Sequence, residues 1–243
     1  HDSKSYEAYD SSGTDGIKTV CYYGATFDGR YVIFTPRDTG DGYHSRVLRY
    51  DTHMDFKHSA SWSAHDANLP HSHQSAAFDG HYIYFCPGYE DTPDSVISEA
   101  KLSGKVLRLD TKSDFKNPAS YSVFDAKTLS AETVCYDGGA FDGRYIYFVP
   151  LATGVVLQYD TTGDFENRDS WRYYDARPLG MQANVGAVFD GRYLYFVAYG
   201  HGLMVRYEFA ETGKMSAFLA YQGVSLNTII RERGLAHSKL RGT

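Results

Sequence analysis

Cysteine and histidine residues occupy equivalent places in three repeated stretches of the sequence. Cys21 and Cys135 each lie six residues before a Phe-Asp-Gly motif, within the string Thr-Val-Cys-Tyr. In a third stretch, His71 and His73 flank the equivalent position. Thiolate sulfur and imidazole nitrogen are ligands of copper and zinc, so these four residues predict a metal site. The alternative is that both cysteines are small buried side chains and both histidines are structural.

The spacing of the two histidines fits such a metal site. Residues two apart on a strand point to the same face, with Cα atoms roughly 6.5–7 Å apart, which suits two imidazoles on one ion. His1 offers an amine and an imidazole that also bind copper, unless it is a remnant of a tag. The chain has three cysteines, not the even set expected of a disulfide framework.

A second group of candidate residues lies in loops that differ from one repeat to the next. Long loops on a rigid scaffold commonly carry function, and tyrosine combines an apolar ring with a polar hydroxyl. We therefore expect one asymmetric site, at the mouth of a central channel, that binds a small molecule or a sugar. The expected ligand-binding residues are Tyr43, His44, Tyr89, Glu90, Asp91, Glu132, Arg177, Tyr199 and His201.

The elements that must position these residues come from one motif, Phe-Asp-Gly-(Arg/His)-Tyr-x-x-Phe. Its four copies start at Phe27, Phe78, Phe141 and Phe189, at offsets of 51, 63 and 48 residues. Periods of this size predict propeller blades of four short strands. The expected fold is therefore all-β, a small β-propeller with four blades, and an incomplete five-bladed ring is the alternative.

Each copy reads as a small-residue strand, an Asp-Gly turn, an apolar strand, a variable loop and two further strands. Asp-Gly between strands is typical of a type I′ turn, which needs positive φ at both central residues. The motif aspartates are expected to accept backbone N–H groups in these turns. The copies cover about 11–67, 68–126, 127–176 and 177–222 of a single domain, 1–243.

The two ends of the chain bear on how the ring closes. Residues 5–10, SYEAYD, match the last strand of each copy, so we expect them to pair with the last blade and close the ring. Residues 216–222, SAFLAYQ, resemble the same strand, so they would then be displaced, or SYEAYD would lie outside them. Residues 223–243 are expected to form a tail or a short helix.

The repeats resemble bacterial β-propeller repeat proteins, in the broad class of kelch, WD40 and tachylectin-like modules. They lack the Trp-Asp end of WD40 repeats and the double glycine of kelch repeats. The resemblance implies the architecture strongly and the function weakly, because propellers host lectins, scaffolds and enzymes alike.

Composition narrows the classes of partner. The net charge is −6 and no run is rich in Lys or Arg, which argues against nucleic acid as a partner. No apolar stretch of about 18 residues is present, so we expect no membrane span. No targeting segment is visible, so a soluble protein is expected.

Three functions follow from these features. The first is a module that binds a small ligand or carbohydrate at the asymmetric site. The second is an enzyme that acts on a small molecule, with copper or zinc held by the four Cys and His residues, or with acids such as Asp15 and Glu132 at the channel mouth. The third is a protein-interaction scaffold.

Overall fold

The computed structural model describes residues 5–90 and 101–208. In these residues the secondary structure is strand with short 3-10 turns. No helix in this part is long and apolar enough to cross a membrane. The turns are η2 (Thr14–Gly16), η3 (Ser59–Ser61), η5 (Pro118–Ser120), η6 (Ala126–Thr128), η7 (Arg168–Ser170) and η8 (Arg177–Leu179).

The strands form four antiparallel sheets, each ordered along the chain. The first sheet holds β1 (Tyr22–Phe27), β2 (Tyr31–Pro36), β3 (Arg46–Asp51) and β4 (Trp62–Asp66). The second holds β5 (His71–Phe78), β6 (Tyr82–Glu90), β8 (Lys105–Asp110) and β9 (Tyr121–Asp125), with β7 (Lys101–Leu102) beside β6. The third holds β10 (Tyr136–Phe141), β11 (Tyr145–Pro150), β12 (Val155–Asp160) and β13 (Trp171–Asp175). The fourth, in the described residues, holds β14 (Asn184–Phe189), β15 (Tyr193–Ala198) and β16 (Val205–Glu208).

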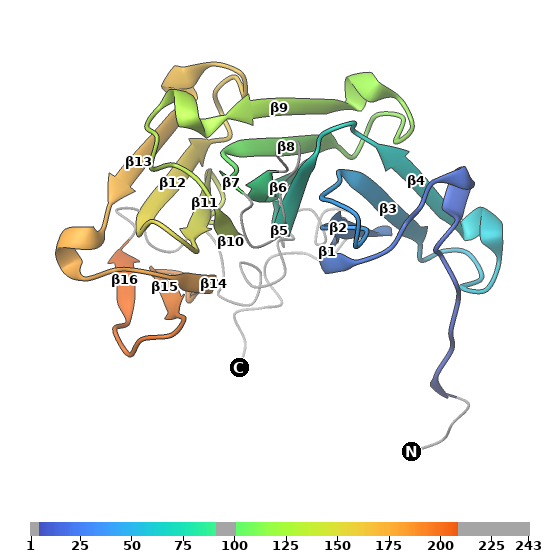
Figure 1. Ribbon diagram of the computed structural model, residues 1–243, viewed down its shortest axis with the longest axis horizontal. Coiled ribbons are helices and arrows are strands. Elements are labelled where there is room, and N and C mark those ends of the chain that lie inside the picture. Colours follow the sequence, from blue (N-terminus) through green and yellow to red (C-terminus); the bar gives the residue numbers. More distant parts are fainter. Residues whose placement is uncertain (1–4, 91–100, 209–243) are drawn as a thin grey trace, which may run out of the picture.

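The four sheets stand side by side as the blades of a propeller (Figure 1). The first strand of each blade is the innermost, and β1, β5, β10 and β14 lie next to one another in that order. The all-β class, the four blades and their strand order confirm the prediction from the repeat. Figure 1 shows the blades as an arc, with β1 and β14 in the blades at its two ends.

The expected closing segment lies at one end of this arc. Residues 5–10 form no strand pair with β16 in the described part of the chain. Instead the ring of Tyr9 stacks on that of Trp62 in the first blade, with centroids 4.9 Å apart. Closure of a ring within one chain therefore stays a prediction.

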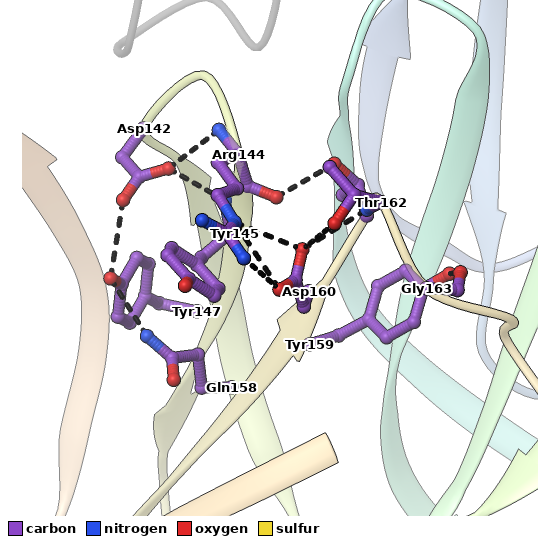
Figure 2. Close-up of polar contacts among 10 residues, drawn as sticks. Asp142, Arg144, Tyr145, Tyr147, Gln158, Tyr159, Asp160, Thr162 and Gly163 are labelled. Carbon is purple, nitrogen blue, oxygen red and sulfur yellow. Dashed lines mark hydrogen bonds and ion pairs between the residues drawn. The ribbon is translucent and has the colours of Figure 1, made fainter. Parts of the chain in front are cut away.

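The motif aspartate organises the turn between the first two strands of each blade, shown for the third blade in Figure 2. One oxygen of Asp142 accepts the backbone N–H groups of Arg144 (2.8 Å) and Tyr145 (2.6 Å). Its other oxygen accepts the Tyr147 hydroxyl (3.2 Å). The Arg144 guanidinium then binds Asp160 at the end of β12 (2.6 Å), which lowers the pKa of Asp160 to about 2.

The other blades repeat this turn. Asp28, Asp79 and Asp190 each accept the two equivalent N–H groups. His81 takes the place of the arginine and contacts Asp110 at 2.8 Å. The motif aspartates are therefore turn acceptors, as predicted.

The predicted turn type was wrong. Positive φ occurs at the motif glycines, with values of 107° at Gly29 and 105° at Gly143, but not at the aspartates before them. A turn with positive φ at the first central residue alone is of the type II′ kind. The N–H of Asp142 donates to the carbonyl of Tyr145, so the aspartate is the first residue of the turn and the two central residues are Gly143 and Arg144.

The turn aspartates give a matched pair for mutation. We expect Asp142→Ala to lower the free energy of unfolding by about 1–3 kcal/mol, because it leaves donors unpaired in a half-buried turn. Asp190→Ala removes the same bonds from an exposed turn, where water replaces the carboxylate, so its loss should be smaller. Urea unfolding of both variants checks this, and equal losses would contradict it.

Candidate functional site

Side chains from different blades meet at the inner strands. The hydroxyl of Tyr23, on β1, donates to Oδ2 of Asp137, on β10, at 2.9 Å. The guanidinium of Arg37 lies over the Tyr23 ring, 4.7 Å from its centroid. With Tyr89 and Cys135, described below, these residues form what we call the inner-strand cluster.

Repeat position explains why two of these residues meet. Tyr23 and Asp137 each lie four residues before the motif phenylalanine of their strand. Alternate residues of a strand share a face, and the same position in different inner strands is presented to the same side of the arc. Gln74 occupies this position in the second blade and is buried.

The backbone at the start of the inner strands places Arg37. Cys21 and Cys135 both have φ of 55°, in the left-handed region. The carbonyl of Cys21 accepts the N–H of Arg37 (3.2 Å), and that of Cys135 accepts the N–H of Leu151 (2.9 Å). Arg37 therefore occupies a place that a leucine fills in the third blade, and its charge is specific to the first.

Burial and charge act against each other on the acid of the cluster. Burial raises the pKa of Asp137, while the Tyr23 hydroxyl and the positive charge of Arg37 lower it. The net shift is upward. Burial and the Asp137 charge both raise the pKa of Tyr23. Asp137 is therefore a carboxyl group in a low-dielectric environment whose polar partners, Tyr23 and Arg37, both come from the first blade.

Tyr89 brings the second blade into the cluster. Its ring stacks on that of Tyr43, with centroids 5.8 Å apart. Burial, followed by the nearby Cys135 thiol, raises the pKa of the Tyr89 hydroxyl. Burial raises the pKa of Cys135 to about 12, so the thiol is protonated at neutral pH. The thiolate, which is the nucleophilic and metal-binding form, is thus disfavoured here.

The residues expected to hold a metal do not come together. Cys21 is exposed and Cys135 is buried. Nδ1 of His71 lies 3.1 Å from the Ser103 hydroxyl and 3.6 Å from a Glu90 oxygen. Nowhere in residues 5–90 and 101–208 do three or more His, Cys, Asp or Glu side chains gather in a group that could hold a metal ion.

His73 is wholly buried, and within the described residues neither of its ring nitrogens has a hydrogen-bond partner. Its ring meets the ring of Phe85, with centroids 5.8 Å apart. Burial lowers the pKa of His73 to about 3, so the imidazole is neutral near pH 7. It is a core side chain with unsatisfied polar atoms.

Two histidines expected to line the site instead hold loop backbone in place. Nε2 of His44 lies 3.2 Å from the carbonyl of Val20 and 3.1 Å from that of Asp38. Nε2 of His201 lies 2.9 Å from the carbonyl of Ala183. In both, Nδ1 accepts a backbone N–H two residues on. Both rings are therefore engaged at both nitrogens.

The remaining predicted residues divide between ion pairs and the cluster. Glu90 pairs with Lys127 at 3.0 Å. Glu132 and Arg177 are exposed and lie 3.3 Å apart. Tyr199 is exposed, and its hydroxyl is close enough to Tyr23 to raise the pKa of Tyr23. Asp91 lies outside the described residues.

A hollow of about 210 Å³ lies elsewhere, at the turns of the third blade. Figure 2 shows three of its lining residues bound to one another, through the Arg144 and Asp160 ion pair and the hydrogen bonds of Thr162 to Asp160. This hollow belongs to the repeated turn framework.

Of the residues in or beside the inner-strand cluster, the sequence analysis named Tyr43, Tyr89 and Tyr199 as ligand-binding candidates and Cys135 as a metal ligand. It did not name Tyr23, Arg37 or Asp137. Each of the three missed residues carried a signal. A tyrosine and an aspartate interrupt inner strands rich in small residues, and an arginine stands where another copy has leucine.

The buried histidine gives a pH-dependent prediction. The folded-state pKa of His73 lies below its unfolded value, so the unfolded chain binds the extra proton as the pH falls below about 6.5. The free energy of unfolding should therefore drop from pH 7 toward pH 4. His73→Phe should flatten this slope, and His53→Phe, at an exposed position, should not. Unfolding by urea across this pH range measures both, and identical slopes would contradict the assignment.

Comparison with known proteins leaves the family open. No protein-family model matches the chain, and no curated protein matches it. Among solved structures it is similar to streptogramin B lyase, with 12% identity and a TM-score of 0.45 over 80% of this chain. The chain spans 56% of the length of that structure. The function is therefore inferred from the geometry of the inner-strand cluster.

Proposed function

We propose that the protein binds a small polar ligand, with carbohydrate as the favoured class, at the inner-strand cluster. The observation that carries this proposal is the hydrogen bond between Tyr23 and Asp137, with Arg37 stacked on the same tyrosine ring. These side chains come from the first and third blades and converge at one place.

The chemistry of the cluster suits hydroxyl-rich ligands. A carboxylate and a guanidinium form charge-assisted hydrogen bonds, which are about twice as strong as neutral ones. Tyrosine rings offer flat apolar surface together with a polar hydroxyl. A few convergent polar groups among aromatic rings are typical of small-molecule sites.

The cluster is also specific to one place in the molecule. The equivalents of Tyr23 and Asp137 are Gln74 in the second blade and Val185 in the fourth. A lectin with one site per repeat would present the same residues in every blade. The difference between blades therefore favours a single asymmetric site.

The two other functions expected from the sequence have less support. A metal-dependent enzyme would use Cys21, His71, His73 and Cys135 together, and the described residues hold no such group. A scaffold would need exposed apolar surface, and the part of that surface on the two end blades is considered below.

Removal of the Asp137 charge tests the proposal. Hydrogen bonds to charged groups contribute about 1.5–3 kcal/mol, so we expect Asp137→Asn to weaken sugar binding about 10- to 100-fold. Saturation-transfer NMR on a panel of neutral and acidic monosaccharides and disaccharides identifies the ligand, and calorimetry with the best sugar measures the change.

The matched control is Asp164→Asn, at an exposed turn where the carboxylate accepts one backbone N–H from Glu166. It should leave the affinity unchanged. A panel with no bound sugar, or equal affinity of the wild type and Asp137→Asn, would overturn carbohydrate binding at this cluster.

A further inference from the structure

Each blade has two different faces. At every boundary between two neighbouring blades, a face of one kind packs against a face of the other kind. We call the face toward the next blade along the chain the forward face, and the opposite one the rear face. On the forward face of the second blade, Tyr84 lies against Tyr159 of the third, with centroids 5.5 Å apart. On that of the third blade, Tyr147 lies against Tyr207 of the fourth, at 5.8 Å.

Two further kinds of contact recur at the boundary between the first and second blades and at that between the second and third. The guanidinium of Arg49 lies 4.1 Å from the ring centroid of Phe115 in the next blade, and Arg108 lies 4.1 Å from that of Phe165. The outer strands also stack across the boundary, with His65 on Tyr121 at 4.4 Å. Phe124 stacks on Trp171 at 4.3 Å.

The rear face of the first blade exposes a residue that this pattern buries elsewhere. Phe27 is 40% exposed, whereas the equivalent Phe78, Phe141 and Phe189 are 2%, 6% and 4% exposed. Phe56, equivalent to the arginine-covered Phe115 and Phe165, is half-buried rather than buried.

The forward face of the fourth blade is open in the same way. Tyr195 is 37% exposed, whereas the equivalent Tyr84 and Tyr147 are 1% and 4% exposed. Arg206, equivalent to Arg49 and Arg108, is exposed. A Cβ on Gly138 would lie 2.8 Å from Gly186 of the next blade, while a Cβ on Gly186 itself would have no atom of the described chain within 4 Å.

We infer that these two open faces bind each other between two copies of the chain, head to tail, so that two arcs close into one ring. The forward face of the fourth blade and the rear face of the first are the two halves of the boundary that occurs three times inside the chain. A second copy therefore carries the complement of both open faces. In Figure 1 the two end blades lie at the open side of the arc, and a twofold axis there forms both contacts at once.

The segment 5–10 supports this arrangement. Its Tyr9 stacks on Trp62 as His65 stacks on Tyr121 and Phe124 on Trp171. Relative to the first blade, this segment therefore takes the position that the outer strand of one blade takes relative to the blade after it. In the closed pair this segment runs beside β16 of the second copy, so the pairing expected from the sequence is made between chains.

The test is the mass of the full chain in solution, measured by sedimentation equilibrium over a concentration series. We expect a dimer for the wild type. Phe27→Lys and Tyr195→Lys should each give monomers, because each places an uncompensated charge in both boundaries. Tyr173→Lys, at an exposed tyrosine of the outer strand β13, is the matched control and should stay dimeric.

Mixing the two monomeric variants separates an interface effect from misfolding. One boundary of the mixed pair then carries both substitutions and the other carries neither, so dimers should return in the mixture. If either variant fails to fold by circular dichroism, Arg206→Glu tests the same boundary.

Three results would overturn the inference. They are a monomeric wild type, a dimer that survives both substitutions, and an open series of larger species.

Discussion

Aromatic rings fill every boundary between neighbouring blades, and the order of the blades depends on them. The motif phenylalanine of one blade packs under the apolar strand of the blade before it, and the outer strands stack ring on ring, as Phe124 does on Trp171. Aromatic pairs with such geometry contribute beyond the apolar area they bury. Because the same residue types recur in each copy, one boundary is built three times, and the inner strands are brought side by side as a consequence.

The candidate site exists because the inner strands depart from this regularity. A position filled by glutamine and valine in two blades holds Tyr23 and Asp137 in the other two. Because the inner strands lie close together, these two residues, which differ from those of the other repeats, form one hydrogen bond with each other. Arg37 adds a charge that the equivalent leucine of the third blade does not supply. The candidate site is therefore formed by residues that differ between repeats, on a framework that is the same in every repeat.

Local features of the sequence predicted the framework well. The repeat spacing predicted the four blades. The role of the motif aspartates, such as Asp142, could be predicted from residue type because the turn they hold spans only a few residues. The type of the turn was not predicted correctly, because the sequence does not show which two residues stand at its centre. The closing strand was expected from its likeness to the other outer strands, and its contact with Trp62 was not.

The site was harder to predict, because its residues are far apart in the sequence. Tyr23 and Asp137 are separated by 114 positions, and their contact requires the direction of side chains on two inner strands. The variable loops supplied Tyr89 and Tyr199, which lie in or beside the inner-strand cluster. The same criterion selected His44 and His201, whose ring nitrogens contact loop carbonyls. Variability between repeats therefore does not separate residues that hold loops in place from residues that could meet a ligand.

The serial arrangement of the inner strands has a consequence for how the chain folds. Each of β1, β5, β10 and β14 lies beside the next one along the chain, so the contacts that build the arc join segments about one repeat apart. Loop closure over such distances has a modest entropic cost, and proteins with this organisation fold by adding units to a nucleus. Within a single chain only the two middle blades have a described neighbour on both sides, so in the monomeric variants amide hydrogens should exchange with solvent progressively faster toward either end.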